Sequence, residues 1–301
     1  DNNGLLWLGF YNKGIGTVNI GNMKFQNINL LYNVHPKGEN IGVFAVHRSA
    51  NNLWVGTLRG GFFRFETDQR GNVLANSLDR TPLETQDISA LEFDQSGRLW
   101  IGGFDWGVMH SKNRVYDKSE WISLSFRKIT PETEPALSGW SVRDLHVDYR
   151  GHIWTSTVDN EFSEYIPAQD SMIHYTTKTV NGLKKDKFWE IHHTGINHKV
   201  LIATNYNGLG VLDTKELSIC YIPQNGHHNF VSIKDIYPLS DSVFYLAGSE
   251  FLKVTIREND NYVVEDMGLQ LDKIQNRLIA ILHADDDDIW LVFENMLGKY
   301  N

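Results

Sequence analysis

The sequence predicts an all-β protein, a seven-bladed β-propeller of four-stranded antiparallel blades whose end blades are incomplete. The main observation is a short unit, Asp-x-x-Gly-x-(Leu/Ile)-Trp-apolar-small, that recurs along the 301 residues. Seven anchor positions of this unit follow one another at spacings of 47, 46, 54, 47, 44 and 45 residues. A period in the mid-forties is the length of four short strands with their turns, which is one propeller blade. Apolar stripes with helical spacing, by contrast, do not extend beyond about a dozen residues.

Each part of the unit has an expected place in a blade. The anchors are Trp7, Trp54, Trp100, Trp154, Leu201, Tyr245 and Trp290. The Asp-x-x-Gly segment suits the turn between the first and second strands, because Asp bonds nearby backbone and Gly accepts a positive φ. The anchor is expected on the second strand, buried between neighbouring blades. The small residue two positions later leaves room for the next blade.

Four strands are expected around each anchor, counted from the innermost outward. In the clearest repeats the first strand covers 43–48, 89–93, 142–147 and 278–283, and the third covers 62–65 and 108–111. The fourth strand is the least regular and is expected at 121–126. Blade 1 lacks a first strand and blade 7 lacks a fourth, so about 26 strands are expected rather than about 28. Residues 1–301 are therefore interpreted as a single propeller segment excised from a longer protein.

Composition and charge argue against several functions. The net charge is −9 and the 28 basic residues form no long run, so nucleic acid is not expected as a partner. The single cysteine, Cys220, cannot form an internal disulfide. No apolar run reaches about 18 residues, so no membrane span is expected in this segment.

Two copies of the repeat match a known family pattern, Asp-x-x-Gly-x-Leu-Trp-Ile-Gly-Thr-x-x-Gly-Gly-Leu. The matching residues are 53–57 with 60–62, and 97–102 with 107 and 108. These residues resemble the regulator-propeller repeats of hybrid two-component sensors from glycan-degrading gut bacteria. The resemblance implies a non-enzymatic, periplasmic sensor propeller that binds oligosaccharide fragments, or relays their binding, to control glycan-utilisation genes. It also implies a homodimeric parent protein that carries a histidine kinase and a response regulator elsewhere, with an oligosaccharide or a neighbouring sensor domain as partner.

Aromatic residues outside the repeat mark the candidate ligand site. Trp106 follows a second strand, and Trp140 and Trp189 lie where first strands begin, so all three are expected on one face of the propeller. Aromatic rings stack on the flat C–H faces of sugars, and polar side chains bond their hydroxyls. The predicted ligand-binding residues are Arg59, Asp105, Trp106, Trp140, Asn160, Trp189, Tyr206 and Asn207. The alternative is that the loop aromatics simply cap the ends of the blades.

No catalytic, metal or cofactor site is predicted from the sequence. The histidine pairs at 192–193 and 227–228 lack the spacing and the partner residues of a zinc site. The acidic run at 285–288 lacks the pattern of a calcium loop and is interpreted as the turn before Trp290.

Three charged residues are expected to line the central channel. Arg143, Glu190 and Lys234 each lie eleven residues before an anchor, which predicts equivalent first-strand positions and a salt-bridged group. Two alternatives to the sensor remain open at this point. One is a purely structural or protein-interaction propeller, and the other is a propeller lyase or hydrolase that uses such charged residues.

Overall fold

The computed structural model describes the part of the chain that forms the strands and most of their turns. The described residues are 5–10, 14–19, 24–28, 42–49, 51–68, 73–74, 79–80, 86–115, 125–158, 161–196, 198–222, 232–257, 261–269, 277–284, 289–293 and 297–300. Within these ranges no helix has the length and apolar character needed to cross a membrane.

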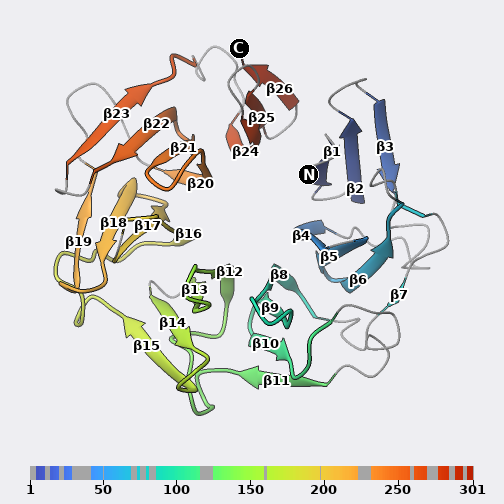
Figure 1. Ribbon diagram of the computed structural model, residues 1–301, viewed down its shortest axis with the longest axis horizontal. Coiled ribbons are helices and arrows are strands. Elements are labelled where there is room, and N and C mark those ends of the chain that lie inside the picture. Colours follow the sequence, from blue (N-terminus) through green and yellow to red (C-terminus); the bar gives the residue numbers. More distant parts are fainter. Residues whose placement is uncertain are drawn as a thin grey trace. The chain divides into compact units, whose positions relative to one another are not determined.

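Two compact units divide the chain, and each is described by itself. The first comprises residues 1–153 and 167–171. Three sheets lie wholly within this unit. The first consists of β1 (Leu5–Phe10), β2 (Gly14–Asn19) and β3 (Lys24–Ile28), and the second of β4 (Gly42–Ser49), β5 (Asn52–Leu58), β6 (Gly61–Glu66) and β7 (Asp79–Arg80). The third consists of β8 (Ile88–Phe93), β9 (Leu99–Gly103), β10 (Gly107–Ser111) and β11 (Phe126–Ile129). Strands adjacent in sequence are hydrogen-bonded neighbours in every sheet (Figure 1).

The second unit comprises residues 154–166 and 172–301. Its sheets are β16 (Phe188–His193), β17 (Lys199–Thr204), β18 (Leu209–Asp213) and β19 (Ser218–Tyr221); β20 (Ile233–Pro238), β21 (Val243–Gly248), β22 (Phe251–Ile256) and β23 (Tyr262–Asp266); and β24 (Leu278–Ala284), β25 (Ile289–Phe293) and β26 (Leu297–Tyr300). A further sheet has β12 (Val142–Val147) in the first unit and most of β13 (Ile153–Thr157), β14 (Phe162–Ile166) and β15 (Ser171–Tyr175) in the second.

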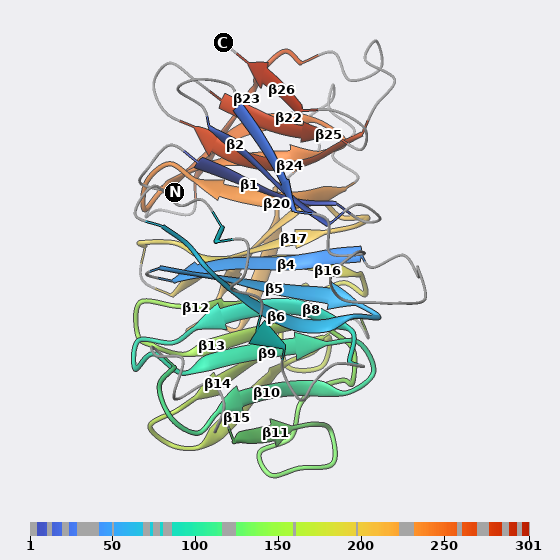
Figure 2. The same cartoon turned by 90° about the vertical axis from the view of Figure 1, so that its right-hand side faces the viewer.

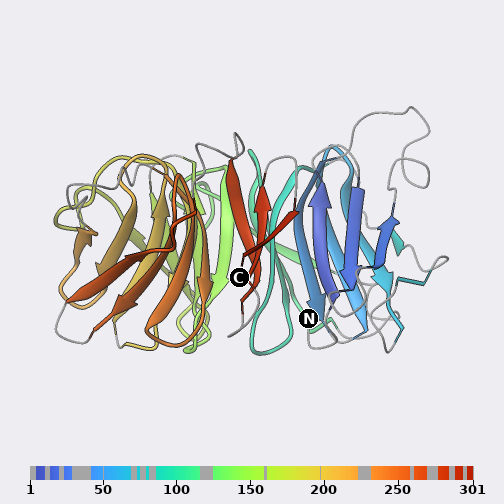
Figure 3. The same cartoon turned by 90° about the horizontal axis from the view of Figure 1, so that it is seen from above.

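The prediction of an all-β propeller built from small antiparallel sheets is confirmed. Among the described residues five sheets have four strands, whereas β1–β3 and β24–β26 have three each (Figure 3 shows the latter as red arrows). The expected first strands correspond to β4, β8, β12 and β24. The fourth strand expected at 121–126 overlaps β11 only at Phe126, where β11 begins, and residues 121–124 lie outside the described residues. The number of blades in a closed ring and the single-segment organisation stay predictions, because each unit is described by itself.

Neighbouring sheets pack on one another within each unit. In the first unit β8 contacts β4 and β5, and β12 contacts β8 and β9. Figure 2 shows the blue strands β4–β6 beside the green strands β8–β10. In the second unit β20 contacts β16 and β17, and β24 contacts β20 and β21. The first strand of each of these sheets therefore covers the first two strands of the sheet before it.

The aspartate of the repeat holds the turn and the anchor together. One oxygen of Asp94 accepts hydrogen bonds from the backbone N–H groups of Ser96 and Arg98, at 2.9 and 3.0 Å. The other oxygen accepts the indole N–H of Trp100 at 2.9 Å. Burial alone would raise the pKa of Asp94, but hydrogen bonds from the Ser96 hydroxyl, the Trp100 indole and the Arg98 backbone, with the charge of Arg98, hold it below its usual value. In the last repeat Ala284 stands at the position of Asp94, and the buried indole N–H of Trp290 has no acceptor within the described residues.

The anchors are buried on second strands, as predicted. Trp54, Trp100, Trp154 and Trp290 are at most 4% exposed. Leu201 and Tyr245 occupy the same place and are 0% and 8% exposed. Trp7 lies on β1 in the expected register, and its side chain is outside the described part of the structure.

The small residue two positions after Trp54 and after Trp100 makes room for the next sheet, as predicted. A Cβ added at Gly56 would lie 2.4 Å from a methyl carbon of Ile88, which begins β8. A Cβ at Gly102 would lie 2.8 Å from a methyl carbon of Val142, which begins β12. Real Cβ atoms do not approach so closely, so glycine at these positions sets the spacing between sheets.

A β-bulge recurs at the start of the first strands. In β8, β16, β20 and β24 the pairing with the second strand skips the second residue of the first strand, and in β4 it skips the third. The skipped residues are Phe44, Ser89, Trp189, Lys234 and Ile279. A bulge re-aims the side chain of its extra residue. Three of these side chains contact loops of the predicted ligand site: Phe44 meets Phe104, and Trp189 and Lys234 bond Asn205.

Candidate functional site

In the first unit, the loop between β5 and β6 is bonded to the segment that leads into β8. Arg59 has a positive φ of 66° and an exposed side chain. Its backbone N–H donates to the carboxylate of Asp87 at 2.6 Å. Asp87 therefore fixes a strained turn and leaves the guanidinium of Arg59 in solvent.

The loop between β9 and β10 repeats this arrangement. Asp105, with a φ of 63°, accepts a hydrogen bond from the Ser141 hydroxyl at 2.5 Å. The carbonyl of the neighbouring Trp140 accepts the backbone N–H of Gly107 at 2.8 Å. The Trp140 side chain is 37% exposed. The predicted site residues Arg59, Asp105 and Trp140 are thus presented on the loops of one unit.

Trp106 does not belong to an exposed site, and its prediction as a ligand-stacking residue is wrong. Only 6% of the residue is exposed, and its indole N–H donates to the Asp87 carbonyl at 3.0 Å. The ring packs in the core cluster that contains Trp54 and Ile88. It also fills the space beside Gly103, where an added Cβ would lie 2.0 Å from the indole. Trp106 is a structural residue that supports the neighbouring Asp105.

An aromatic pair that sequence reasoning missed lies near these loops. Phe44, the bulge residue of β4, is 40% exposed and meets Phe104 edge to face, with ring centroids 5.7 Å apart. The guanidinium of Arg143 lies 5.9 Å from the Phe104 centroid. Burial lowers the pKa of Arg143 from its usual value. The repeat pattern gave no signal for this contact, because Phe44 and Phe104 lie outside the repeated unit.

In the second unit, a buried carboxylate fixes the loop between β17 and β18. Asp186 is 2% exposed and accepts the backbone N–H groups of Asn205 and Tyr206, at 3.1 and 2.9 Å. It also accepts the side-chain amide of Asn207 at 2.6 Å. The Tyr206 side chain is 61% exposed, the largest exposure among the exposed large hydrophobic residues described. The structure therefore brings the predicted residues Tyr206 and Asn207 together through Asp186, which the sequence analysis did not select.

Trp189 is bound into the same network rather than free in a loop. It is the bulge residue of β16 and is half-buried. Its indole N–H donates to the Asn205 side-chain oxygen at 3.0 Å, and the Lys234 ammonium donates to that oxygen at 2.9 Å. The Lys234 nitrogen lies 3.4 Å from the Trp189 ring centroid, a cation–π contact. The expectation that Trp189 is an exposed residue of little structural weight is therefore wrong.

The predicted site is thus resolved into two groups, one in each unit. Arg59, Asp105 and Trp140 belong to the first, and Trp189, Tyr206 and Asn207 belong to the second. Asn160 lies outside the described residues. Asp87 and Asp186 bond the loops of the first and the second group. Nothing in the sequence indicated this role, apart from their position just before a first strand.

The three charged first-strand residues do not occupy equivalent positions. Arg143 and Lys234 are second residues of their strands, whereas Glu190 is the third residue of β16. The turn before Leu201 is longer than the others, so equal spacing from the anchor does not mean equal register. Glu190 accepts the backbone N–H of Ile236 at 2.7 Å. The salt-bridged channel group stays a prediction.

Asp235 continues this pattern in the next sheet. Its carboxylate accepts the backbone N–H of Ile281 at 2.8 Å, just as that of Glu190 accepts Ile236. Burial raises the pKa of Asp235 to about 6, although its hydrogen bonds to Ile281 and Glu190 lower it. Carboxylates that follow the bulge therefore join consecutive first strands of the second unit.

A half-buried titratable pair lies on β4 and β8 of the first unit. His47 Nδ1 and Glu92 Oε1 are 3.9 Å apart. Burial lowers the pKa of His47 to about 4 and raises the pKa of Glu92 to about 7. Between these pH values both side chains are neutral, so the contact is not an ion pair there.

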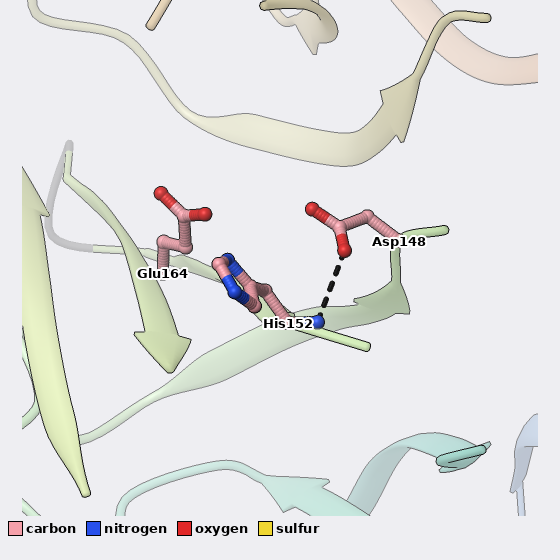
Figure 4. Close-up of side chains that lie close together, drawn as sticks. All are labelled: Asp148, His152 and Glu164. Atoms are coloured by element: carbon pink, nitrogen blue, oxygen red, sulfur yellow. Dashed lines mark hydrogen bonds between the residues drawn. The ribbon is translucent and has the colours of Figure 1, made fainter. Parts of the chain in front are cut away.

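Asp148, His152 and Glu164 form the group of potential metal ligands found within the described residues (Figure 4). One ligand atom of each lies within 4.8 Å of the others. Asp148 is a repeat aspartate that accepts the Arg150 guanidinium at 2.6 Å and the His152 backbone N–H at 3.0 Å. Glu164 accepts the Tyr175 hydroxyl at 2.6 Å. These hydrogen bonds explain the positions of both carboxylates. Asp148 and Glu164 are therefore interpreted as structural groups.

Similar solved structures include two of the extracellular domain of BT4673 from B. thetaiotaomicron. One describes it as part of a hybrid two-component system and the other as part of a one-component system. They are 15% and 16% identical to this chain, cover 100% and 99% of it, and have TM-scores of 0.54 and 0.56. This chain spans 46% and 52% of their length, which is about half.

A third similar structure is that of YCF48 bound to D1 peptide. It is 12% identical, has a TM-score of 0.66, and the match covers 98% of this chain and 87% of that one. No family model and no curated protein matches this sequence. At these identities the likeness establishes the fold, a β-propeller arrangement shared with the extracellular domains of a two-component system.

Proposed function

We propose that the chain is the periplasmic sensor propeller of a hybrid two-component system, seven-bladed when closed. In this proposal it binds oligosaccharide fragments, or relays their binding, to control glycan-utilisation genes. The parent protein is a homodimeric membrane sensor with its kinase elsewhere, and this segment has no catalytic activity of its own. The resemblance of the repeat and the likeness to the BT4673 extracellular domains support this role.

The observation that carries the proposal is the way in which each unit fixes exposed side chains on its loops. Asp87 and Asp186 bond the backbone of neighbouring loops, and these bonds leave Arg59 and Tyr206 in solvent on a rigid support. An exposed ring held by a fixed loop loses little conformational entropy when a ligand stacks on it. Such loops suit recognition of a polar ligand.

Calorimetric titration of the purified chain with oligosaccharides of several classes tests this proposal. Trp140→Ala and Tyr206→Ala are expected to weaken binding by about 1–3 kcal/mol each, taking base–aromatic stacking as a proxy. Tyr149→Ala is a matched control, since Tyr149 is 56% exposed and lies in the turn at the other end of β12. If no oligosaccharide binds, or if the two site variants bind like the parent, the structural or protein-interaction propeller is the better assignment.

Recognition of a protein segment is the second candidate function. The exposed Phe44 beside Phe104 favours it, because an aromatic pair of this kind suits an apolar anchor residue. The YCF48 propeller was solved with a bound peptide. Selection from a displayed peptide library would support this function if the selected peptides lost binding to Phe44→Ala and retained binding to Tyr206→Ala.

A further inference from the structure

Lysines gather at one place in the second unit, although the chain as a whole carries a net charge of −9. Residues 184–187 are Lys-Lys-Asp-Lys and lead directly into β16. Lys184, Lys185 and Lys187 are exposed, and none of them forms an ion pair with a carboxylate in the described part of the chain. Local charge here is thus opposite in sign to the net charge.

The acidic residue within this run does not offset the positive charge toward solvent. Asp186 is 2% exposed, and its oxygens accept backbone and amide N–H groups of residues 205–207. A carboxylate that is buried and bonded in this way is unavailable to an external cation. The surface above it therefore presents lysine ammonium groups to the solvent.

The lysines extend from the outer edge of one sheet to the first strand of the next. The Lys184 ammonium lies over the ring of Tyr221, on the outermost strand β19, at 4.9 Å. Lys187 precedes β16, and its carbonyl accepts the backbone N–H of Asn205. At the inner end Lys234 is held by Asn205 and by its cation–π contact with Trp189. A linear ligand with several negative charges would match this row better than a single small anion.

Groups suited to sugar recognition accompany the lysines. Tyr206 presents an exposed ring. The Asn205 side-chain oxygen accepts Trp189 and Lys234, which leaves its amide N–H groups as donors with no acceptor in the described part of this unit. An aromatic ring, amide donors and a row of cations are complementary to the C–H face, the hydroxyls and the acidic groups of one molecule.

We infer that the second unit binds an anionic oligosaccharide, one that carries carboxylate or sulfate groups, along Lys184, Lys185, Lys187 and Lys234. This inference rests on the proposed function, because it specifies the ligand of the same loops. Uronic acids and sulfated sugars offer the same oxyanion chemistry to an ammonium group.

Three oligosaccharides of equal length are compared by calorimetry with the purified chain: a uronate, a sulfated and a neutral one. We expect at least one anionic ligand to bind about tenfold or more tightly than the neutral one, with affinity that falls as NaCl increases. The double variant K185Q/K187Q should weaken that binding about fivefold, from two exposed charge contacts of ordinary strength. Whichever anionic ligand binds identifies the source of the charge.

K178Q/K215Q is the matched control, because it removes two exposed lysines that lie in turns of the same unit and are not among the four lysines of the inferred site. It should bind like the parent, and thermal melting should show both double variants folded. Equal binding of neutral and anionic ligands, or an equal effect of the two double variants, would overturn the inference and leave the proposed function standing. Absence of binding to any of the three would overturn both.

Discussion

Trp106 and Trp140 lie only 34 residues apart in the first unit, yet they have opposite exposures of 6% and 37%. Trp106→Ala is expected to destabilise the fold by about 3–5 kcal/mol, because it leaves a cavity in a packed cluster and removes a hydrogen bond to the Asp87 carbonyl. Trp140→Ala should change stability by less than about 0.5 kcal/mol. Urea unfolding of both variants checks this difference. Equal destabilisation would contradict the packing described for Trp106.

Glu92 makes stability depend on pH in a direction that follows from its raised pKa. Its pKa is about 7 in the fold and about 4.5 when unfolded, so the folded state retains a proton that the unfolded state releases. Stability should therefore fall as pH rises from about 4.5 to about 7. Glu92→Gln removes this loss and should stabilise the chain by roughly 1–3 kcal/mol at pH 8 and much less at pH 5. Melting curves at both pH values, with the exposed Glu132→Gln as control, test the prediction.

His47 changes the pH dependence of stability in the opposite direction. It therefore reduces the pH range in which the effect of Glu92 on stability can be seen alone. Its pKa is about 4 in the fold and about 6.5 when unfolded, so stability should fall as pH decreases between those values. The two effects oppose each other between about pH 4.5 and 6.5. A similar stabilisation of Glu92→Gln at pH 5 and pH 8 would mean that Glu92 is ionised throughout.

The roles of single residues could be predicted from the sequence where the repeat constrains them, and poorly elsewhere. Trp100 and Gly102 could be placed because their roles recur in every copy of the unit. Trp106 could not, because its burial depends on the missing side chain of Gly103 and on the path of the chain at Asp87. These contacts are not part of the repeated unit, so the periodicity of the sequence gives no information about them.

First strands of the second unit are joined by carboxylates as well as by apolar packing. Asp235→Ala is expected to leave the Ile281 N–H without its partner and to destabilise the fold by about 1–3 kcal/mol. Asp235→Asn keeps an oxygen acceptor for that N–H and should have little effect at pH 5. Hydrogen exchange of the Ile281 amide distinguishes the two, since it should be faster in Asp235→Ala alone. Unchanged exchange in both variants would show that the bond from Ile281 to Asp235 has no stabilising effect.

The boundaries of the first strands could be predicted because the turn chemistry is local, whereas the fourth strand and the register could not. β12 begins and ends where the sequence indicated, between a loop and a repeat aspartate. The relation among Arg143, Glu190 and Lys234 was misjudged because one hairpin is longer and the bulge shifts the pairing by one residue. Counting from an anchor does not detect such insertions.

Repeat proteins derive their stability from the sheets and from contacts between neighbouring sheets. Ile101→Val in the first unit and Ile236→Val in the second should each cost about 0.5–1.5 kcal/mol. Because the two residues share no described partner, the double variant should equal the sum within about 0.5 kcal/mol. Urea unfolding of the four proteins measures this. A larger discrepancy would show that packing in one unit depends on packing in the other.

The propeller of small antiparallel sheets could be predicted from the sequence, because a unit of forty-odd residues with the same strand order recurs several times. The candidate site was accessible only in part. The repeat locates the loops, and their exposed residues can be named, but carboxylates such as Asp186 become evident only when the loops they bond are seen together.

The bulge near the start of β4, β8, β16, β20 and β24 has a consequence for how such a protein can diversify. Phe44, Ser89, Trp189, Lys234 and Ile279 differ in size, charge and polarity, yet each is skipped by the pairing between a first and a second strand. A residue skipped by the ladder can change without loss of a strand-pairing hydrogen bond. These positions therefore vary while the strand pairing around them is kept. In the laboratory Phe44 and Ile279, which are 40% and 43% exposed, are the natural sites for a combinatorial library aimed at new ligands.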